Sequence, residues 1–387
     1  MANYVSGINP EILKWARERS GYSLNEMVEK FNKIENWESG EETPTYVQLE
    51  KLAYTHYKLP IAIFFFPEPP QEDDIKKEFR TLPDEEIDKL QPDTRFALRQ
   101  GKAMQIALEE LNDGINTSEH KIFREIRLKS SDNIVKVAEV VRNYLDVPRE
   151  KQFLWKDSDT ALKVWQQAIE EKGIFVFKRP FKQEGISGFS LLDDEFPVIY
   201  LNNSTPRTRQ VFTLFHELTH ILLKTNGITQ KDDRFINRLT GENKEIEVFC
   251  NLFASEFLVP SRDFNQRIAI KNWDDRSIGQ LADRYSVSRE VICRRLLDKK
   301  LVSQDFYEEK VRQWYDEFQK GKKRGKEGGN YYTNKSYYLG EKFLKLAFGR
   351  YYEGLCSAEQ LSDYFNIKVS GISRLEEKLI QKQGLAS

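Results

Sequence analysis

Two of the four histidines in this 387-residue chain lie in the segment FHELTH, as His216 and His220. On an α-helix, residues four positions apart project from the same face, one turn above the other. Both imidazole rings can therefore reach one metal ion at about 2.0–2.1 Å, the usual zinc–histidine distance. Glu217 follows His216 directly, so its carboxylate lies near such an ion without being a ligand. The segment predicts a metal centre.

The spacing His-Glu-x-x-His is the zinc peptidase motif. A metal ion in this motif lowers the pKa of water from about 15.7 toward about 7 and polarises the peptide carbonyl. Glu217 would then remove the water proton and pass it to the leaving amine. The pattern therefore predicts peptide hydrolysis, with His216 and His220 as metal ligands and Glu217 as the general base.

The alternative interpretation is an ordinary amphipathic core helix with two histidines on its polar face. Apolar neighbours argue against it, because they indicate a largely buried helix. They are Val211, Phe212, Leu214, Phe215, Leu218, Ile221, Leu222 and Leu223. Two buried imidazoles and a buried carboxylate need polar partners, and a metal ion would satisfy all three.

A catalytic zinc site needs a third protein ligand and one open position. The downstream candidates are Glu242, Glu245, Glu247 and Glu256. Glu247 stands out because Asn251 follows four residues later on the same predicted helix. Asn251 could then orient a histidine ring through its other nitrogen.

Other interpretations remain for the residues around Glu247. Asn251 could be a helix-surface residue, and Glu245, next to Lys244, is better explained as an exposed carboxylate. Cys250 could be proposed as a ligand, but a small buried apolar residue explains it better.

Zinc is the expected metal, at one ion per chain, although two histidines and a glutamate would also accept manganese or iron. A purely structural zinc is the competing interpretation. Structural zinc usually has four protein ligands rich in cysteine. The three cysteines here (Cys250, Cys293 and Cys356) are far apart and form no close pair.

The segments around the motif predict a small α+β unit. GIFVFKRPF, GISGFSLL and FPVIYLNN read as short consecutive strands, and two helices follow, one with the motif and one ending before Pro260. The strand at 196–203 could be an edge strand that binds substrate. Tyr200, Arg207 and Arg209 are nearby donors for a carbonyl oxygen, and the sequence does not choose among them.

The whole chain is predicted to be mostly helical, with helical modules on both sides of this α+β unit. Six segments are expected: a helix-turn-helix-like region at 1–70, a helical bridging region at 71–165, the metal-binding unit at 166–270, a helix-turn-helix-like module at 271–320, a basic flexible linker at 321–330 and a C-terminal helical module at 331–387. Helix starts are expected at Asn9–Pro10, at Ser23 with Glu26, and at Thr43-Pro44-Thr45.

Composition favours a cytoplasmic globular protein. The net charge is −1, and 39% of residues are hydrophobic. Three scattered cysteines fit reduced thiols. No apolar run approaches the roughly 18 residues of a membrane-spanning helix, and the N-terminus lacks the pattern of a signal peptide. No membrane partner is expected.

The segments RQVFTLFHELTHILL and EVFCNLFASEFLVP resemble the core of the ImmA/IrrE family of metallopeptidases. The resemblance covers residues 173 to about 262 and implies a zincin-like domain. It also implies His216, His220 and Glu247 as metal ligands and Glu217 as general base. Asn251 would support a metal ligand without binding the ion itself. The resemblance further implies a protein substrate: a helix-turn-helix repressor or related regulator encoded nearby, in a phage, mobile-element or stress locus.

Residues 10–60 resemble the lambda-repressor-like (XRE) helix-turn-helix domain, but about four residues are missing where the recognition helix should begin. Recognition helices read bases with their N-terminal residues. Residues 1–60 also contain seven Lys and Arg against nine Glu, whereas a phosphate-binding surface is basic. The segment therefore favours protein interaction over DNA binding. The basic helix-turn-helix pattern at 277–302 and the linker are better DNA candidates, although a solvated charged face explains them more simply.

These observations favour a metal-dependent endopeptidase that cleaves a regulator to control gene expression. The alternative is a DNA-binding transcriptional regulator with a vestigial peptidase domain. The intact His-Glu-x-x-His motif, together with Glu247 as a candidate third metal ligand, argues against that alternative.

Overall fold

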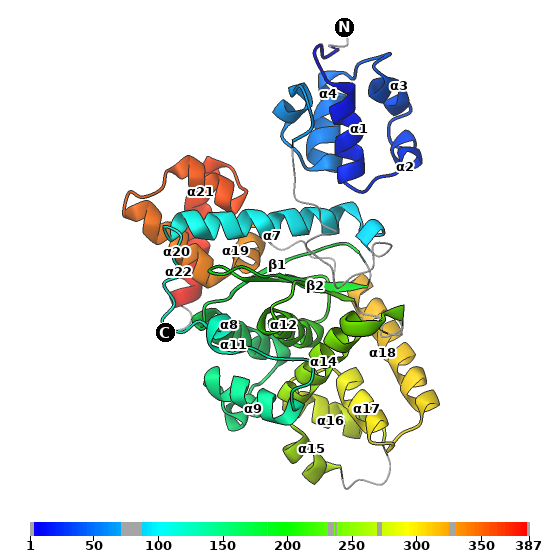
Figure 1. The fold of residues 1–387 in the computed structure, drawn as a ribbon, viewed down its shortest axis with the longest axis vertical. Helices are drawn as coiled ribbons and strands as arrows, with labels where there is room; N and C mark the ends of the chain where they lie inside the picture. The colour runs from blue at the N-terminus through cyan, green and yellow to red at the C-terminus, as the bar shows by residue number, and fades with distance from the viewer. Residues whose placement is uncertain are drawn as a thin grey trace. The chain divides into compact units, whose positions relative to one another are not determined.

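The computed structural model describes residues 4–70, 87–183, 185–230, 236, 238–268, 273–324 and 330–384. The chain divides into two compact units. The first holds residues 1–100 with 181–184, and the second holds 101–180 with 185–387. The division falls within helix α7 (Pro92–Leu111), and Figure 1 shows the elements of both units.

Short helices form the first unit. They are α1 (Pro10–Arg19), α2 (Leu24–Val28), α3 (Ile34–Ser39), α4 (Tyr46–Glu50), the π-helical η1 (Lys51–Tyr57) and the 3-10 helix η2 (Ile61–Phe65). The three expected helix starts are confirmed. Asn9 caps α1 ahead of Pro10, and the capping boxes of α2 and α4 begin at Ser23 and Thr45. The apolar faces enclose a core around Leu13, Trp37 and Phe64.

The second unit contains a mixed four-stranded sheet in the order β1–β3–β2–β4. Its strands are β1 (Phe175–Arg179), β2 (Ile186–Leu191), β3 (Val198–Asn202) and β4 (Gly227–Gln230). β1 pairs parallel with β3, whereas β2 pairs antiparallel with β3 and with β4. A small sheet in a mostly helical chain confirms the predicted α+β class. The sequence indicated the first three strands and missed β4.

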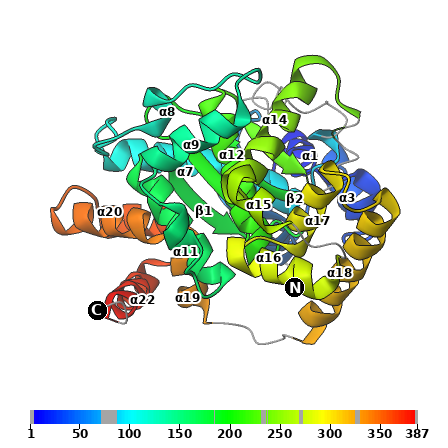
Figure 2. The ribbon, with the colours of Figure 1, turned by 90° about the horizontal axis from the view of Figure 1, so that it is seen from below.

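The second unit also contains a series of helices, of which α11, α12 and α19 pack against the sheet (Figures 1 and 2). They are α8 (Ile122–Glu125), α9 (Ile134–Tyr144), α10 (Arg149–Gln152), α11 (Ser158–Glu171), α12 (Arg207–Leu222), α14 (Gly241–Leu258), α15 (Ser261–Arg267), α16 (Asp275–Tyr285), α17 (Arg289–Asp298), α18 (Gln304–Arg324), α19 (Tyr331–Leu339), α20 (Glu341–Tyr352), α21 (Ala358–Phe365), η3 (Val369–Gly371) and α22 (Ile372–Gly384). The predicted linker at 321–330 begins inside α18, which continues to Arg324, and residues 325–329 lie outside the described part.

The two faces of the sheet carry different side chains, because strand residues alternate between faces. Phe177, Tyr200 and Phe189 lie opposite one another on adjacent strands and share one face, with the rings of Phe189 and Tyr200 stacked at 5.1 Å. That row packs against α7 near Gly101 and against Phe343 of α20. Gly188 and Ser190 therefore turn to the opposite face, which α12 covers.

α12 and α14 pack side by side beneath this face (Figure 2). Their apolar residues form the main core together with α9, α11, α16 and α17. Arg142 of α9 is buried in this core and donates hydrogen bonds to the carbonyl oxygens of Val147 and Phe257. Its guanidinium lies 4.4 Å above the Phe257 ring, so α9 is held against α14.

The prediction that the strand at 196–203 lies at the edge of the sheet is wrong. β3, which occupies Val198–Asn202, is an inner strand with β1 on one side and β2 on the other. Its backbone groups are already paired on both sides, so it cannot accept an added substrate strand. Within the described residues, β4 pairs only with β2 and lies at the end of the sheet nearest His220.

No helix in the described ranges combines the length and the apolar character that crossing a bilayer requires.

The close contact between α12 and β2 predicts that Gly188→Ala destabilises the protein. A Cβ at position 188 would lie 2.6 Å from the Thr213 side chain and 2.8 Å from the carbonyl oxygen of Tyr200. The backbone oxygen cannot move aside cheaply, and overpacking of this kind costs about 1–3 kcal/mol. Thermal unfolding should show a lower midpoint for this variant.

Gly279→Ala in α16 is the matched control. A Cβ there meets nothing within 4 Å, and alanine is favoured over glycine inside a helix by about 1 kcal/mol. Its unfolding midpoint should be equal or higher. An unchanged midpoint for Gly188→Ala would contradict the inferred contact.

Candidate metal centre

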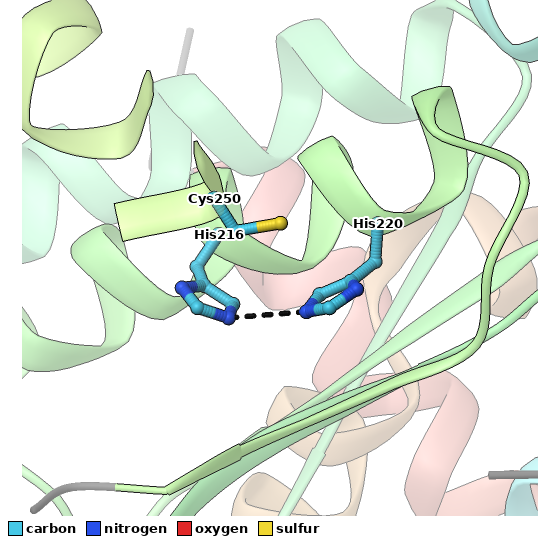
Figure 3. A group of neighbouring side chains, drawn as sticks. All are labelled: His216, His220 and Cys250. Atoms are coloured by element: carbon cyan, nitrogen blue, oxygen red, sulfur yellow. Dashed lines mark hydrogen bonds between the residues drawn. The ribbon is translucent and has the colours of Figure 1, made fainter. Parts of the chain in front are cut away.

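Two imidazole rings of α12 meet at one buried point. The Nε2 atoms of His216 and His220 are 3.1 Å apart, and both side chains are buried. Figure 3 shows the two rings directed toward each other from successive turns of the helix. Helical spacing alone predicted that they would share a face, and the structure shows that their outer nitrogens converge.

Glu247 of α14 completes this group. Its Oε2 lies 3.2 Å from Nε2 of His216, and its Oε1 lies 3.3 Å from Nε2 of His220. The side chain is only 3% exposed. Burial alone would raise the pKa of this carboxyl, but the two histidines lower it to about 2. Glu247 is therefore a buried carboxylate facing two ring nitrogens.

The spacing of these three groups fits a shared cation. Ligand atoms placed about 2.0–2.1 Å from a tetrahedral ion lie about 3.3 Å from one another. The three separations here are 3.1, 3.2 and 3.3 Å. Oε1 of Glu247 is also buried without a hydrogen-bond partner in the described part of the chain. A buried polar oxygen without a partner is costly, so the donor set fits a divalent metal.

The Nδ1 atom of each histidine ring has a polar neighbour of its own. Nδ1 of His216 lies 2.9 Å from Oδ1 of Asn251, and Nδ1 of His220 lies 3.2 Å from the Thr225 hydroxyl. Such contacts fix ring orientation and leave Nε2 free for a metal. Asn251 thus lies next to the His216 ring, and its role behind a metal ligand stays a prediction. Thr225 was missed, although its position just after the helix end was a usable signal.

β4 approaches the second ring closely. A Cβ on Gly227 would lie 2.3 Å from the His220 ring, so only glycine fits at this position. Since β4 was not predicted, this requirement could not be foreseen from the sequence.

The Glu217 side chain points toward the sheet and not in the direction of the two histidine side chains. The Ser190 hydroxyl donates to its Oε2 at 2.7 Å, and the Thr229 backbone NH donates to its Oε1 at 3.1 Å. The Thr229 hydroxyl also donates to Oε1. Three donors from β2 and β4 thus hold both carboxylate oxygens. Neither Ser190 nor Thr229 was singled out by the sequence.

Cys250 lies beside the histidine pair. Its thiol and the ligand nitrogens of His216 and His220 all lie within 4.8 Å of one another, and Figure 3 shows the sulfur beside the two rings. The residue is fully buried. Burial raises the pKa of the thiol to about 11. The sequence favoured a small apolar role for this side chain, and the structure places it within the cluster.

The other candidate carboxylates lie elsewhere. Glu242 and Glu245 are exposed at the start of α14. Glu256 accepts hydrogen bonds from Ser261 and Arg295, so it joins α14 to α15 and α17.

The candidate carbonyl donors also have structural partners. Tyr200 is buried in the aromatic row on the far face of the sheet, and burial raises its pKa to about 12. Arg207 pairs with Asp159 at 2.6 Å, and Arg209 donates to Ser187 at 3.1 Å. No donor for a substrate carbonyl is therefore assigned to these residues.

Arginines of the basic pattern at 277–302 are engaged within the protein. Arg289 pairs with Glu317, Arg294 with Asp298, and Arg295 with Glu256. These pairs agree with a structural role for the segment and leave less positive charge for a nucleic acid.

Three comparisons with known proteins bear on this site. Residues 169–297 match a family model described as Peptidase_M78, IrrE N-terminal-like domain. The comparison with curated proteins gives no match. Among solved structures, a Mycobacterium tuberculosis transcriptional regulator is similar at 16% identity and a TM-score of 0.29, over 42% of this chain and 46% of that one.

The family match covers the sheet, α12 and α14. The chain spans less than half of the matched regulator's length. The segment at 169–297, which holds the two histidines and Glu247, therefore has the character of a metallopeptidase-type domain.

Proposed function

We propose that the protein is a metal-dependent endopeptidase that hydrolyses a peptide bond in a partner protein. The observation that carries the proposal is the convergence of His216, His220 and Glu247, with Oε1 of Glu247 buried and without a hydrogen-bond partner among the described residues. The matched peptidase family supports the same activity.

The ion would be held by Nε2 of both histidines and by the Glu247 carboxylate, with zinc as the expected metal and manganese or iron as other possibilities. When bound, such an ion makes water more acidic and polarises a carbonyl group. Asn251 and Thr225 would keep the two ring nitrogens directed at the ion.

Glu217 would act as the general base. Ser190 and Thr229 fix its carboxylate at one side of the histidine pair, which limits the positions from which it can take a proton. The carboxylate accepts a proton from the attacking water and returns it to the leaving amine nitrogen, so it ends the cycle unchanged. A hydroxyl donor such as Ser190 can rotate to follow this change.

The partner is proposed to be a helix-turn-helix repressor or related regulator encoded nearby, as the family resemblance implies. An extended segment of that protein could add to the free side of β4, because β4 lies at the sheet end beside His220 and pairs only with β2 within the described residues. The helical modules on either side of residues 169–297 would recognise this partner.

Glu217→Gln tests the assignment of the base. The amide keeps the shape of the side chain and one acceptor oxygen, which can still receive the Thr229 hydrogen bonds, but it cannot accept the water proton. Cleavage should fall by about 100-fold or more, whereas metal content should stay at one ion per chain. Cleavage is measured by gel densitometry and metal by elemental analysis. Glu245→Gln, an exposed residue of α14, is the matched control and should cleave normally. Normal cleavage by Glu217→Gln would remove this residue from its role.

Glu247→Ala and Asn251→Ala test the metal ligands in a graded way. Loss of the carboxylate should reduce the bound metal to well below one ion per chain. In Asn251→Ala, which removes the amide next to His216, metal affinity should fall by about 10–100-fold. This variant should still bind one ion per chain when the metal is saturating. Competition with a chromogenic chelator gives both values. Full affinity in Glu247→Ala would exclude this carboxylate as a ligand.

Substrate identity is tested by incubation with the purified regulator encoded by the neighbouring gene. Cleavage is expected with wild-type protein and excess zinc, and it should disappear with a chelator and return when zinc is restored. Mass spectrometry of the fragments identifies the broken bond. An intact regulator under metal-replete conditions would contradict the proposed partner and leave the hydrolytic site to be tested on unfolded protein substrates.

A further inference from the structure

Cys250 occupies a position from which a thiol could reach the same ion. It follows Glu247 by three residues on α14, so the two side chains lie on one face of the helix, a turn apart. Its thiol lies within 4.8 Å of a nitrogen of each histidine. Figure 3 shows the sulfur beside the two rings.

A second observation at this point also indicates a missing cation. Oε1 of Glu247 is buried and has no hydrogen-bond partner among the described residues. The Glu247 oxygens and the Cys250 sulfur each lie near the same two rings: the oxygens are 3.2 and 3.3 Å from the Nε2 atoms, and the sulfur is within 4.8 Å of a nitrogen of each ring. Two imidazoles, a carboxylate and a thiol are four donor groups, which is the coordination number that zinc prefers in proteins.

Cys293 provides the contrast. It is equally buried, but it lies in α17 within the apolar core and belongs to no group of metal-binding side chains within the described residues. Burial of a cysteine in this protein is thus not by itself a sign of metal binding. Cys250 differs from Cys293 in its position beside the nitrogens of His216 and His220.

We propose that Cys250 is a fourth protein ligand of the metal ion in the resting protein. The proposal rests on the proposed function, because it concerns the same ion. On binding, the thiol loses its proton to solvent and the sulfur forms the bond to the metal. A thiolate favours zinc or cobalt(II) over manganese or magnesium, which prefer oxygen ligands.

Coordination by Cys250 has a consequence for catalysis. A catalytic zinc site keeps one position open, whereas four protein ligands close it. The sulfur must therefore leave the ion before a water or a peptide carbonyl can take its place. The resting protein is then a closed form, and substrate binding or a change at the thiol opens it.

Cobalt(II) titration of the metal-free full-length chain tests this inference by absorption, without any activity measurement. Wild-type protein should develop a sulfur-to-cobalt charge-transfer band in the near ultraviolet that saturates at one cobalt per chain. Cys250→Ala should bind one cobalt, seen in the visible bands, and lose the near-ultraviolet band. Cys293→Ala, the matched control, should keep it. Cys250→Ser preserves side-chain volume and should also lose the band, which guards against a folding defect in the alanine variant.

The outcomes separate this inference from the proposed function. Cobalt binding by the wild type without the band, or a band that persists in Cys250→Ala, overturns Cys250 as a ligand and leaves the endopeptidase proposal intact. No cobalt binding by folded wild-type protein overturns both. In Cys250→Ala the affinity for zinc should fall relative to the affinity for manganese. Loss of a residue that only supports a ligand typically costs about tenfold in metal affinity, so the ratio of the two affinities should fall by at least about tenfold. An unchanged ratio would count against the inference.

Discussion

A buried carboxylate between two imidazole rings is the constraint on which the rest of this domain depends. Glu247 is removed from water and faces Nε2 of both His216 and His220. An isolated buried charge would cost several kcal/mol, so the packing of α12 against α14 must keep the three groups together. The apolar residues that surround them bring the two helices to the required separation, and Arg142 holds α14 from the side of α9.

The sheet supplies the other half of the arrangement through small and hydroxyl-bearing residues. Strand alternation directs Gly188 and Ser190 of β2 toward α12, and β4 adds Gly227 and Thr229 in register with them. The glycines let the backbone approach the helix closely, while Ser190 and Thr229 hold Glu217. About 3.6 residues per turn place Glu217 to one side of the histidine pair, so one helix presents two imidazoles to Glu247 of α14 and a carboxylate to the sheet.

The parts of this structure that depend on neighbouring residues could be predicted from the sequence. Helix starts at Asn9, Ser23 and Thr45 follow from local hydrogen bonds, and the pairing of His216 with His220 follows from helical periodicity. The parts that depend on distant residues could not. Strand order is set by long-range pairing, and the parallel pairing of β1 with β3 turns a strand expected at the edge into an inner one. Ser190, Thr229 and Thr225 approach the site only through that tertiary arrangement.

On α14, Cys250 and Asn251 lie on either side of Glu247. With about 100° between successive residues, Asn251 is displaced about 40° to one side of Glu247 and Cys250 about 60° to the other. Asn251 accordingly contacts His216, whereas the Cys250 sulfur lies within 4.8 Å of a nitrogen of each ring. A side chain at position 250 is thus held beside the two rings. A thiol is a softer donor than a carboxylate, so α14 places one hard and one soft donor group beside the two rings.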